Sequence, residues 1–432
     1  MNFNIITLGC KVNQYESQAM EEMLLKNGYF RSENPDSVDI TVINTCTVTS
    51  VSDAKNRKII HKARRNNPDG IIVLTGCMPQ AFPDDFDTFK DCDIVLGNYA
   101  RKDLISALEQ FFITHSQIIM IKDNTEKAPK FEKLAVEDFG EHTRAFVKIE
   151  DGCNRFCSYC IIPYARGRVR SKSIEDLSLE IEHLADHGYK EVVLVGINLS
   201  AYGQDIGKNL CDAVEAVCKN DRILRVRLGS LEPEQMDEEV IARLAKQPKL
   251  CPQFHLSLQS GCDDTLRRMN RHYDTKLYEQ IVSNLRNTFE NASVTTDIMV
   301  GFPGETDREF KASVDFLERI SFAKAHVFPY SRRKGTVADK SPDQVDERIK
   351  TDRSKQMIAL TLKTRRRFLQ TQINRVEPVL FETMKSDGVC TGYTKNYTPV
   401  HVASETDLCG SIHNVKIISA KDDFCIGELQ SN

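Results

Sequence analysis

The feature that most limits the fold is an alternation of short apolar runs with helix-length polar stretches across residues 144–372. Six runs have the length and the Val, Ile and Leu content of buried strands: AFVKIEDG, EVVLVGI, ILRVRLGS, PQFHLSLQS, SVTTDIMVGF and KAHVFPY. Helical stretches such as SIEDLSLEIEHLADHG, with a serine cap and a terminal glycine, separate the runs. The alternation predicts six βα units in a partial parallel barrel, because the complete barrel has eight.

The first 115 residues or so show the same alternation and add three cysteines. The runs FNIITLGC, DITVINTC and GIIVLTGC end in Cys10, Cys46 and Cys77, whereas a fourth run, DIVLGN, lacks a cysteine. The carboxyl ends of parallel strands share one edge of a sheet, where ligands bind. We therefore expect the three thiols to converge there, although any single one could be a small buried core residue.

The other segments differ in character. Residues 116–143 are polar and weakly periodic, which is typical of a linker. Residues 373–432 alternate in β fashion with turn residues between the runs, which predicts a small antiparallel β-barrel. The predicted fold class is therefore α/β, with an N-terminal parallel domain (1–115), a linker, a partial (β/α)6 barrel (144–372) and a C-terminal barrel.

Composition indicates the cellular compartment and the kinds of partner to expect. No apolar run in the 432 residues approaches the length of a membrane span, and MNFNIITLGC has no charged leader, so we expect a cytoplasmic protein without a membrane partner. Fourteen cysteines in a reducing compartment favour metal or redox chemistry over disulfides. The formal net charge of −4 means that a nucleic acid would have to bind local basic patches.

A second group of cysteines lies on the loop DGCNRFCSYCIIPYARG, which follows the first predicted barrel strand and holds Cys153, Cys157 and Cys160. Zinc sites usually take four ligands in two close pairs, and no fourth Cys or His follows nearby. Three thiolates on a four-iron cluster leave one iron open to a substrate or cofactor. The spacing favours an iron–sulfur cluster, with zinc and a distant fourth ligand as the alternative.

This loop, with Tyr159 before its last cysteine, is similar to the signature of radical S-adenosylmethionine (SAM) enzymes. Over essentially its full length, the chain resembles the methylthiotransferase family of that superfamily, which has an N-terminal three-cysteine domain, a radical SAM partial barrel and a C-terminal TRAM β-barrel. The wording TLGCKVNQYES and CNRFCSYCIIPYARGRVRS resembles the subgroup that acts on N6-threonylcarbamoyladenosine in tRNA. The isopentenyladenosine subgroup typically has GCQMN at the first cysteine, and the ribosomal protein S12 subgroup has GCPKN.

The resemblance implies a reaction and its cofactors. Cys153, Cys157 and Cys160 would hold one 4Fe-4S cluster that binds SAM, and Cys10, Cys46 and Cys77 a second 4Fe-4S cluster that carries the transferred sulfur. A 5′-deoxyadenosyl radical would remove the hydrogen from C2 of the adenine at position 37, and a second SAM would supply the methyl group. The implied partners are tRNA bearing threonylcarbamoyladenosine and an electron donor such as flavodoxin or ferredoxin. We expect a monomer, and we expect the remaining eight cysteines to be buried or incidental thiols.

Candidate SAM contacts follow the predicted strand ends, where a barrel directs polar groups at its ligand. These candidates are Ser230, Glu232, Gln259 and Asp297. Each could instead cap a helix or satisfy a loop. Tyr159 is expected to lie near the adenine of SAM and to contact it through its backbone, and GFPGE resembles the adenine-side strand of the superfamily.

Basic clusters indicate where RNA would bind. The three clusters are AKNRKIIHKARR, YSRRKG and KTRRRF. One charge run is usually a solvated face, but three in an acidic chain suggest a phosphate-binding track. We predict that Arg332, Arg333 or Lys334 pairs with the free carboxylate of threonylcarbamoyladenosine. Tyr393 and Lys395, on a predicted turn of the last domain, are further RNA candidates.

Two other classes of function remain open from the sequence. One is methylthiolation of an aspartate of ribosomal protein S12, or of isopentenyladenosine in tRNA. The other is a non-enzymatic RNA-binding protein with structural metal, which the basic clusters and the final barrel would suit. The enzyme predicts roughly eight irons per chain, and a zinc scaffold predicts none.

Overall fold

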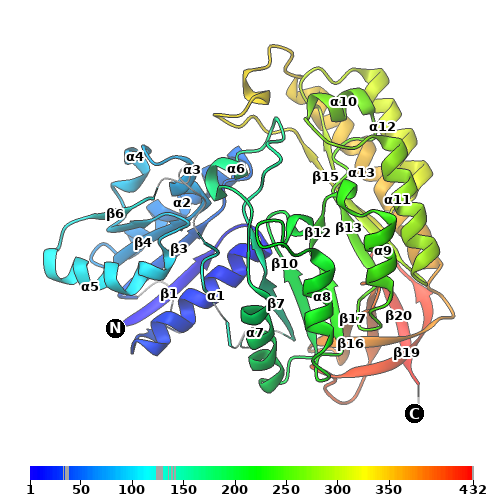
Figure 1. The fold of residues 1–432 in the computed structure, drawn as a ribbon, viewed down its shortest axis with the longest axis horizontal. Helices are drawn as coiled ribbons and strands as arrows, with labels where there is room; N and C mark the ends of the chain where they lie inside the picture. The colour runs from blue at the N-terminus through cyan, green and yellow to red at the C-terminus, as the bar shows by residue number, and fades with distance from the viewer. Residues whose placement is uncertain are drawn as a thin grey trace.

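The computed structural model describes residues 1–430 except 33, 35–37, 123–129, 135, 138–139 and 141–142. Figure 1 shows the N-terminal domain in blue and cyan beside a partial barrel in green and yellow, with a small red barrel beneath the strands of the partial barrel. Within the described residues, no helix combines the length and the apolar character that a membrane span requires.

The N-terminal domain contains a parallel sheet with strand order β2-β1-β3-β4-β5-β6. The strands are β1 (Asn2–Thr7), β2 (Phe30–Arg31), β3 (Ile40–Thr45), β4 (Ile71–Gly76), β5 (Ile94–Leu96) and β6 (Ile118–Met120). The helices are α1 (Lys11–Lys26), α2 (Ser50–Asn66), α3 (Cys77–Ala81), α4 (Phe86–Phe89), η1 (Arg101–Asp103) and α5 (Leu104–Thr114). Apolar residues of α1 and α5 pack on one face of the sheet, and those of α2 and α4 pack on the other.

The four strands predicted in this domain all form, with two additions. β3 and β4 are buried on both faces, which explains their continuous apolar sequence. β2 has only two residues. β6 pairs with β5 through Ile118 and Ile94, although it lies in the segment predicted to be a linker.

The central domain is a partial barrel of parallel strands. Its strands are β7 (Arg144–Lys148), β10 (Glu191–Val195), β11 (Arg225–Leu228), β12 (Ser230–Leu231), β13 (Gln253–Leu256), β14 (Ser293–Val300) and β15 (Lys324–Pro329). The orders β11-β10-β7 and β12-β13-β14-β15 are joined by a parallel bridge between Val226 and Leu250. A short antiparallel ribbon, β8 (Glu150–Asp151) with β9 (Arg170–Ser171), frames the cysteine loop. All six predicted strands are present, which confirms the partial barrel.

The central domain has longer helices that cover the outer face of the barrel (Figure 1) and short ones in its loops, such as Ile162–Arg166, which lies against α3. They are α6 (Ile162–Arg166), α7 (Ile174–Asp186), η2 (Leu199–Ala201), α8 (Leu210–Cys218), η3 (Pro233–Gln235), α9 (Glu238–Ala245), α10 (Asp263–Arg268), α11 (Thr275–Thr288), α12 (Asp307–Ile320), η4 (Ala338–Lys340) and α13 (Glu347–Gln370). The serine cap predicted for α7 forms, since the Ser173 hydroxyl accepts the Asp176 N–H. At the start of α12, Thr306 forms a capping box with Glu309.

The C-terminal domain is a closed five-stranded barrel with order β16-β17-β18-β20-β19. Its strands are β16 (Val376–Met384), β17 (Val389–Thr394), β18 (Pro399–Ala403), β19 (Ile412–Ala420) and β20 (Cys425–Leu429). The predicted small barrel is confirmed, but it is not wholly antiparallel, because β18 pairs with β20 in parallel to close it. It docks where the central strands begin: Arg225 donates to the Pro378 carbonyl at 2.6 Å, and Ser293 to the Asn396 carbonyl at 2.6 Å.

Candidate metal centres and active-site cavity

The first cysteine triplet lies where three parallel strands of the N-terminal sheet end. Cys10 is the N-cap of α1 after β1, Cys46 directly follows β3, and Cys77 begins α3 after β4. At Gly9, with φ +108°, a Cβ would come within 2.9 Å of the Cys46 sulfur, so a side chain there would fill the space between the thiols. The structure thus brings these three thiols together. Cys10 is exposed, whereas Cys46 and Cys77 are buried.

A buried cation accompanies this triplet. Burial raises the pKa of the Cys46 thiol to about 12, whereas the Arg166 guanidinium acts in the opposite direction on both Cys46 and Cys10. Arg166 is fully buried, donates from Nε to the Cys77 sulfur at 3.2 Å and pairs with Glu16 at 2.5 Å. Positive charge beside three thiols favours their anionic form and therefore an anionic metal group.

The second triplet lies on the loop between β8 and α6. The Cys160 N–H donates to the Cys157 carbonyl at 2.9 Å, which closes a tight turn between two of the thiols. Arg271 donates from Nη1 to the Cys157 sulfur at 3.2 Å and from Nη2 to Glu232. Burial raises the pKa of Cys153 to about 12, and it also raises that of Cys160. Each triplet therefore has three thiols and one arginine.

The spacing of the thiols suits a cluster better than a single zinc ion. Zinc–sulfur bonds of about 2.3 Å in a tetrahedron place the sulfurs about 3.8 Å apart. In the described part of the chain, only Cys262, Asp264 and Glu309 form a group of three potential ligands whose atoms all lie within 4.8 Å of one another. Neither cysteine triplet is that compact. A donor set of three spaced thiols with a neighbouring cation fits a 4Fe-4S cluster.

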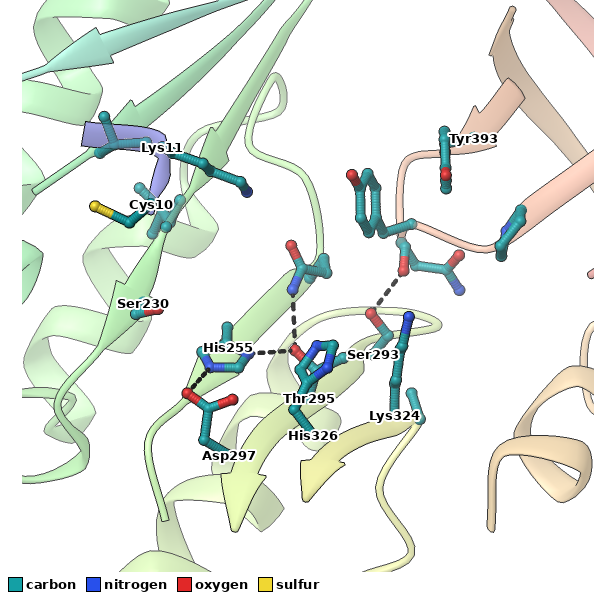
Figure 2. Close-up of a pocket in the computed structure, with 18 of the residues that line it drawn as sticks. Cys10, Lys11, Ser230, His255, Ser293, Thr295, Asp297, Lys324, His326 and Tyr393 are labelled. Atoms are coloured by element: carbon teal, nitrogen blue, oxygen red, sulfur yellow. Dashed lines mark hydrogen bonds and ion pairs between the residues drawn. The ribbon is translucent and has the colours of Figure 1, made fainter. Parts of the chain in front are cut away.

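A cavity of about 900 Å³ lies among the three domains (Figure 2). Its lining includes Cys10 and Lys11 of the N-terminal domain, Ser230, His255, Asp297, Lys324 and His326 of the central barrel, and Tyr393, Tyr397, His401 and Phe424 of the C-terminal barrel. This volume is typical of sites that enclose a small molecule. Because Cys10 is the exposed member of its triplet, the first metal centre would open onto this cavity.

Lys11 is a cation in an unfavourable place. Lys11 is exposed to the solvent of the cavity, but desolvation by the surrounding walls, followed by repulsion from Arg144 and Arg227, lowers the pKa of Lys11 to about 8. Its ammonium group lies 5.7 Å from the centre of the Phe146 ring. Sequence reasoning did not single out this residue, because nothing in the periodicity distinguishes it from other surface lysines.

The predicted SAM contacts fall in two places. Ser230 and Asp297 line the cavity, where Asp297 lies 3.3 Å from the Nε2 of His255. Glu232 lies on the other side, beside the second cysteine triplet, through its bond to Arg271. His255 was not predicted, although its position two residues into a barrel strand could have indicated an inward-facing side chain.

The other two predicted cofactor residues belong to different segments: Gln259 follows β13, and Tyr159 is half-buried on the cysteine loop. Gln259 is buried with φ +66°, and its Oε1 has no hydrogen-bond partner within the described part of the chain. Its N–H donates to the Asp297 carbonyl at 2.9 Å. The Tyr159 ring meets the edge of Phe302 at 6.3 Å between centroids. An unpaired buried amide oxygen is a feature of sites that await a ligand.

The predicted RNA contacts are only partly available to a ligand. Arg333 is buried and binds Asp53 and Thr47 of the N-terminal domain, so it joins two domains and does not face the cavity. Arg332 pairs with Asp339 at 3.1 Å, whereas Lys334 is exposed.

In the C-terminal barrel, the two candidates predicted on a turn behave differently: Lys395 lies on the turn after β17, whereas Tyr393 lies within β17 itself. Tyr393 stacks on Tyr397 with centroids 4.4 Å apart, and Arg144 lies about equally far above both rings, at 5.2 and 5.1 Å. Lys395 donates to the Pro248 carbonyl at 3.3 Å. Tyr393 therefore lies on the cavity wall, whereas Lys395 helps to dock the domain.

Comparison with known proteins agrees with this fold. Residues 147–317 match the radical SAM superfamily, and residues 2–97 match a family described as uncharacterized protein family UPF0004. The radical SAM methyltransferase TsrM of Kitasatospora setae has a similar fold, with a TM-score of 0.58 at 15% identity over 78% of this chain and 76% of that chain. The fold and the cysteine loop define a radical SAM enzyme.

Relatives of nearly the same length narrow this class, and the chain belongs to the radical SAM tRNA methylthiotransferase family. It is 37% identical over 429 residues to the threonylcarbamoyladenosine tRNA methylthiotransferase MtaB of Bacillus subtilis, covering 98% of this chain and 95% of the relative. Against MtaB of Thermotoga maritima the identity is 34% over 423 residues, again covering 98% and 95%. It is also 35% identical over 437 residues to the tRNA-2-methylthio-N6-dimethylallyladenosine synthase of Clostridium botulinum strain Loch Maree, covering 99% and 96%.

The predicted enzyme class is therefore confirmed, and the non-enzymatic alternative is wrong. The family implies a 4Fe-4S cluster and SAM as cofactors and tRNA as the substrate.

Proposed function

We propose that this protein converts N6-threonylcarbamoyladenosine at position 37 of tRNA to its 2-methylthio derivative. Identity alone does not separate this substrate from dimethylallyladenosine, because relatives named for the two substrates match at 37% and 35%. The observation that carries the proposal is the charge of the cavity next to Cys10. Lys11, Lys324 and Arg365 line the cavity together with two acids, Asp297 and Asp423, and Lys11 is the cation that directly follows Cys10. A carboxylate-bearing substituent suits such a wall, whereas a dimethylallyl group would gain nothing from it.

The two cysteine triplets divide the work in this proposal. Cys153, Cys157 and Cys160 would hold the cluster that binds SAM, and Cys10, Cys46 and Cys77 a second 4Fe-4S cluster. When bound, these groups would supply a 5′-deoxyadenosyl radical to remove the C2 hydrogen, a sulfur atom for C2 and, from a second SAM, a methyl group. This proposal requires an electron donor of the flavodoxin or ferredoxin type, and we propose that the protein acts as a cytoplasmic monomer.

The protein's own side chains have supporting roles in this proposal. Arg166 and Arg271 each donate to one cysteine sulfur at 3.2 Å, so they hold the thiolate rotamers and offset their charge. Asn13 accepts from Arg166 at 2.8 Å and faces the Cys10 thiol at 3.6 Å, which links that thiol to the buried arginine. The stacked rings of Tyr393 and Tyr397 form the wall of the cavity on the side of the C-terminal barrel and offer a surface on which a base can stack.

The test of this reaction is mass spectrometry of tRNA nucleosides from a strain that lacks the protein, with and without a plasmid that supplies it. The expected result is that 2-methylthio-N6-threonylcarbamoyladenosine appears only with the plasmid. Appearance of the dimethylallyl derivative alone, or a change in ribosomal protein S12 and not in tRNA, would contradict the proposal.

The second cluster has its own test. Anaerobic reconstitution should give about eight irons per chain, and the Cys46→Ala variant about four. Cys92 is also buried, but it belongs to neither triplet, so Cys92→Ala is the matched control and should keep the full iron content. Equal iron in the Cys46→Ala variant and the unmodified protein would exclude a second cluster at this site.

A further inference from the structure

One cation of the cavity is placed to recognise the substrate. Lys11 directly follows Cys10 and is the first residue of α1. Figure 2 shows its side chain extending from the blue segment toward the open centre of the cavity, between the barrel strands and Tyr393 of the C-terminal domain. A ligand held next to Cys10 would therefore meet this ammonium group.

Neighbouring cations are already paired. Arg144 bonds to Glu382 at 2.7 Å, and Arg227 bonds to Glu191 at 3.0 Å. Within the described ranges Lys11 forms no ion pair and its ammonium group contacts the Phe146 ring, while the nearby Glu191 carboxylate is bonded to Arg227. A cation that lies near other cations and has no acid of its own attracts an anion from outside the protein.

The end of α1 adds to this attraction. The N-cap of the sixteen-residue helix is Cys10, which makes no side-chain capping bond, so the first N–H groups lack that partner. The positive end of the helix dipole and the Lys11 ammonium group therefore face the same part of the cavity.

The other cavity cations are less suitable. Arg365 uses its guanidinium on the carbonyls of Ala323 and Asp423, at 3.3 and 3.0 Å. Lys324 begins β15 on the far side of the cavity from Cys10 (Figure 2). Arg333, the sequence-based candidate, is occupied by Asp53.

We propose that Lys11 binds the carboxylate of the threonylcarbamoyl group and so selects this substrate over adenosines with a neutral N6 substituent. The inference rests on the proposed function. In the proposed reaction C2 would lie near the group held by Cys10, Cys46 and Cys77, which would supply the sulfur, and the N6 substituent projects from the same edge of the base, past N1. The residue next to Cys10 is therefore within reach of that substituent.

The test compares two anticodon stem-loop RNAs that differ only at position 37, one with threonylcarbamoyladenosine and one with adenosine. Binding of each to the reconstituted protein is measured by fluorescence anisotropy, together with kcat and KM for the modified RNA. A charge-assisted contact predicts that Lys11→Gln weakens binding of the modified RNA by about 10- to 100-fold and leaves that of the plain RNA unchanged. Lys11→Arg should restore much of the ratio.

Misfolding or loss of iron would weaken the binding of both RNAs alike. The ratio of the two affinities is therefore independent of these effects. Lys276→Gln is the matched control, since it removes an exposed lysine of α11 that lies outside the cavity lining, and it should leave the ratio unchanged. Suppose that the unmodified protein methylthiolates the modified RNA. Then equal weakening of the binding of both RNAs by Lys11→Gln, or no change in the binding of either, overturns the inference. If the unmodified protein does not act on that RNA at all, the proposed function fails as well.

Discussion

Removal of Arg353 is expected to destabilise the central barrel by an amount that depends on pH. Arg353, on α13, lies 2.7 Å from Glu305 and also donates to the Glu305 carbonyl at 2.9 Å. Both side chains are buried. Glu305 belongs to GFPGE, the loop that follows β14, and also accepts the Gly301 N–H at 2.7 Å. Arg353→Met would leave this carboxylate without its counter-ion.

Two free-energy costs limit the expected loss of stability: that of an unpaired buried carboxylate and that of protonating it. Removing one partner of a buried ion pair costs about 3–5 kcal/mol. Glu305 can instead take up a proton, and doing so near pH 7.5 from an ordinary pKa of 4.5 costs about 4 kcal/mol, which caps the loss. Near pH 5.5 the same cap is only about 1.4 kcal/mol. Burial already raises the pKa of Glu305, and loss of the Arg353 charge raises it further, so protonation is the favoured response.

The assay is urea denaturation followed by far-UV circular dichroism, because the chain has no tryptophan to report by fluorescence. We expect a loss in free energy of unfolding of about 3–4 kcal/mol near pH 7.5 that shrinks toward about 1 kcal/mol near pH 5.5. The double variant Arg353→Met with Glu305→Gln should recover much of the loss. Arg222→Met removes a solvent-exposed arginine that pairs with Glu182 and Asp186, so it should leave the stability nearly unchanged at both pH values. Losses that are the same at both pH values would refute the reasoning.

Two further predictions concern a buried acid and the docking of the last domain. Burial raises the pKa of Glu150, so the folded chain keeps a proton that the unfolded chain releases above about pH 4.5; stability therefore falls as pH rises from there toward the folded pKa. Glu150→Gln should be more stable than the unmodified protein near pH 7.5 and equally stable near pH 4, and parallel stability curves would exclude this. Arg227 lies 4.5 Å over the Tyr397 ring and Arg144 5.1 Å over it, so Tyr397→Leu should loosen the C-terminal barrel by about 1–3 kcal/mol. Faster proteolysis near residues 371–375 is the expected readout, and unchanged cleavage would count against the contact.

Local patterns predicted much of the fold. The apolar runs of the N-terminal and central domains correspond to strands, because a strand buried on both faces must be apolar throughout. The two short strands β2 and β6 were not predicted, since two or three residues carry too little periodicity to recognise. The parallel pairing of β18 with β20 was also missed. Alternation of apolar and polar residues indicates which face of a strand is buried, but it does not indicate which strand pairs with it.

The candidate site was predicted unevenly. Cysteine spacing indicated both triplets, since thiols at strand ends and on one short loop have few other uses. Arg166 and Arg271 were not singled out, although each donates to a cysteine sulfur. The basic run YSRRKG was assigned to the substrate, but the structure uses Arg333 to join two domains. A charge run shows that cations are present and does not show which acids lie opposite them.

The sequence by itself determined the order of strands and helices, the two groups of thiols and the family to which the chain belongs, because these depend on local spacing and residue type. Only the tertiary structure decided that Cys10 opens onto a cavity while Cys46 and Cys77 are buried, and that Lys11 lacks an acidic partner among the described residues. Burial and charge pairing depend on contacts between segments more than a hundred residues apart, such as Arg166 with Glu16. Such contacts form only when the domains pack together, so the charge available to a ligand is a property of the folded molecule.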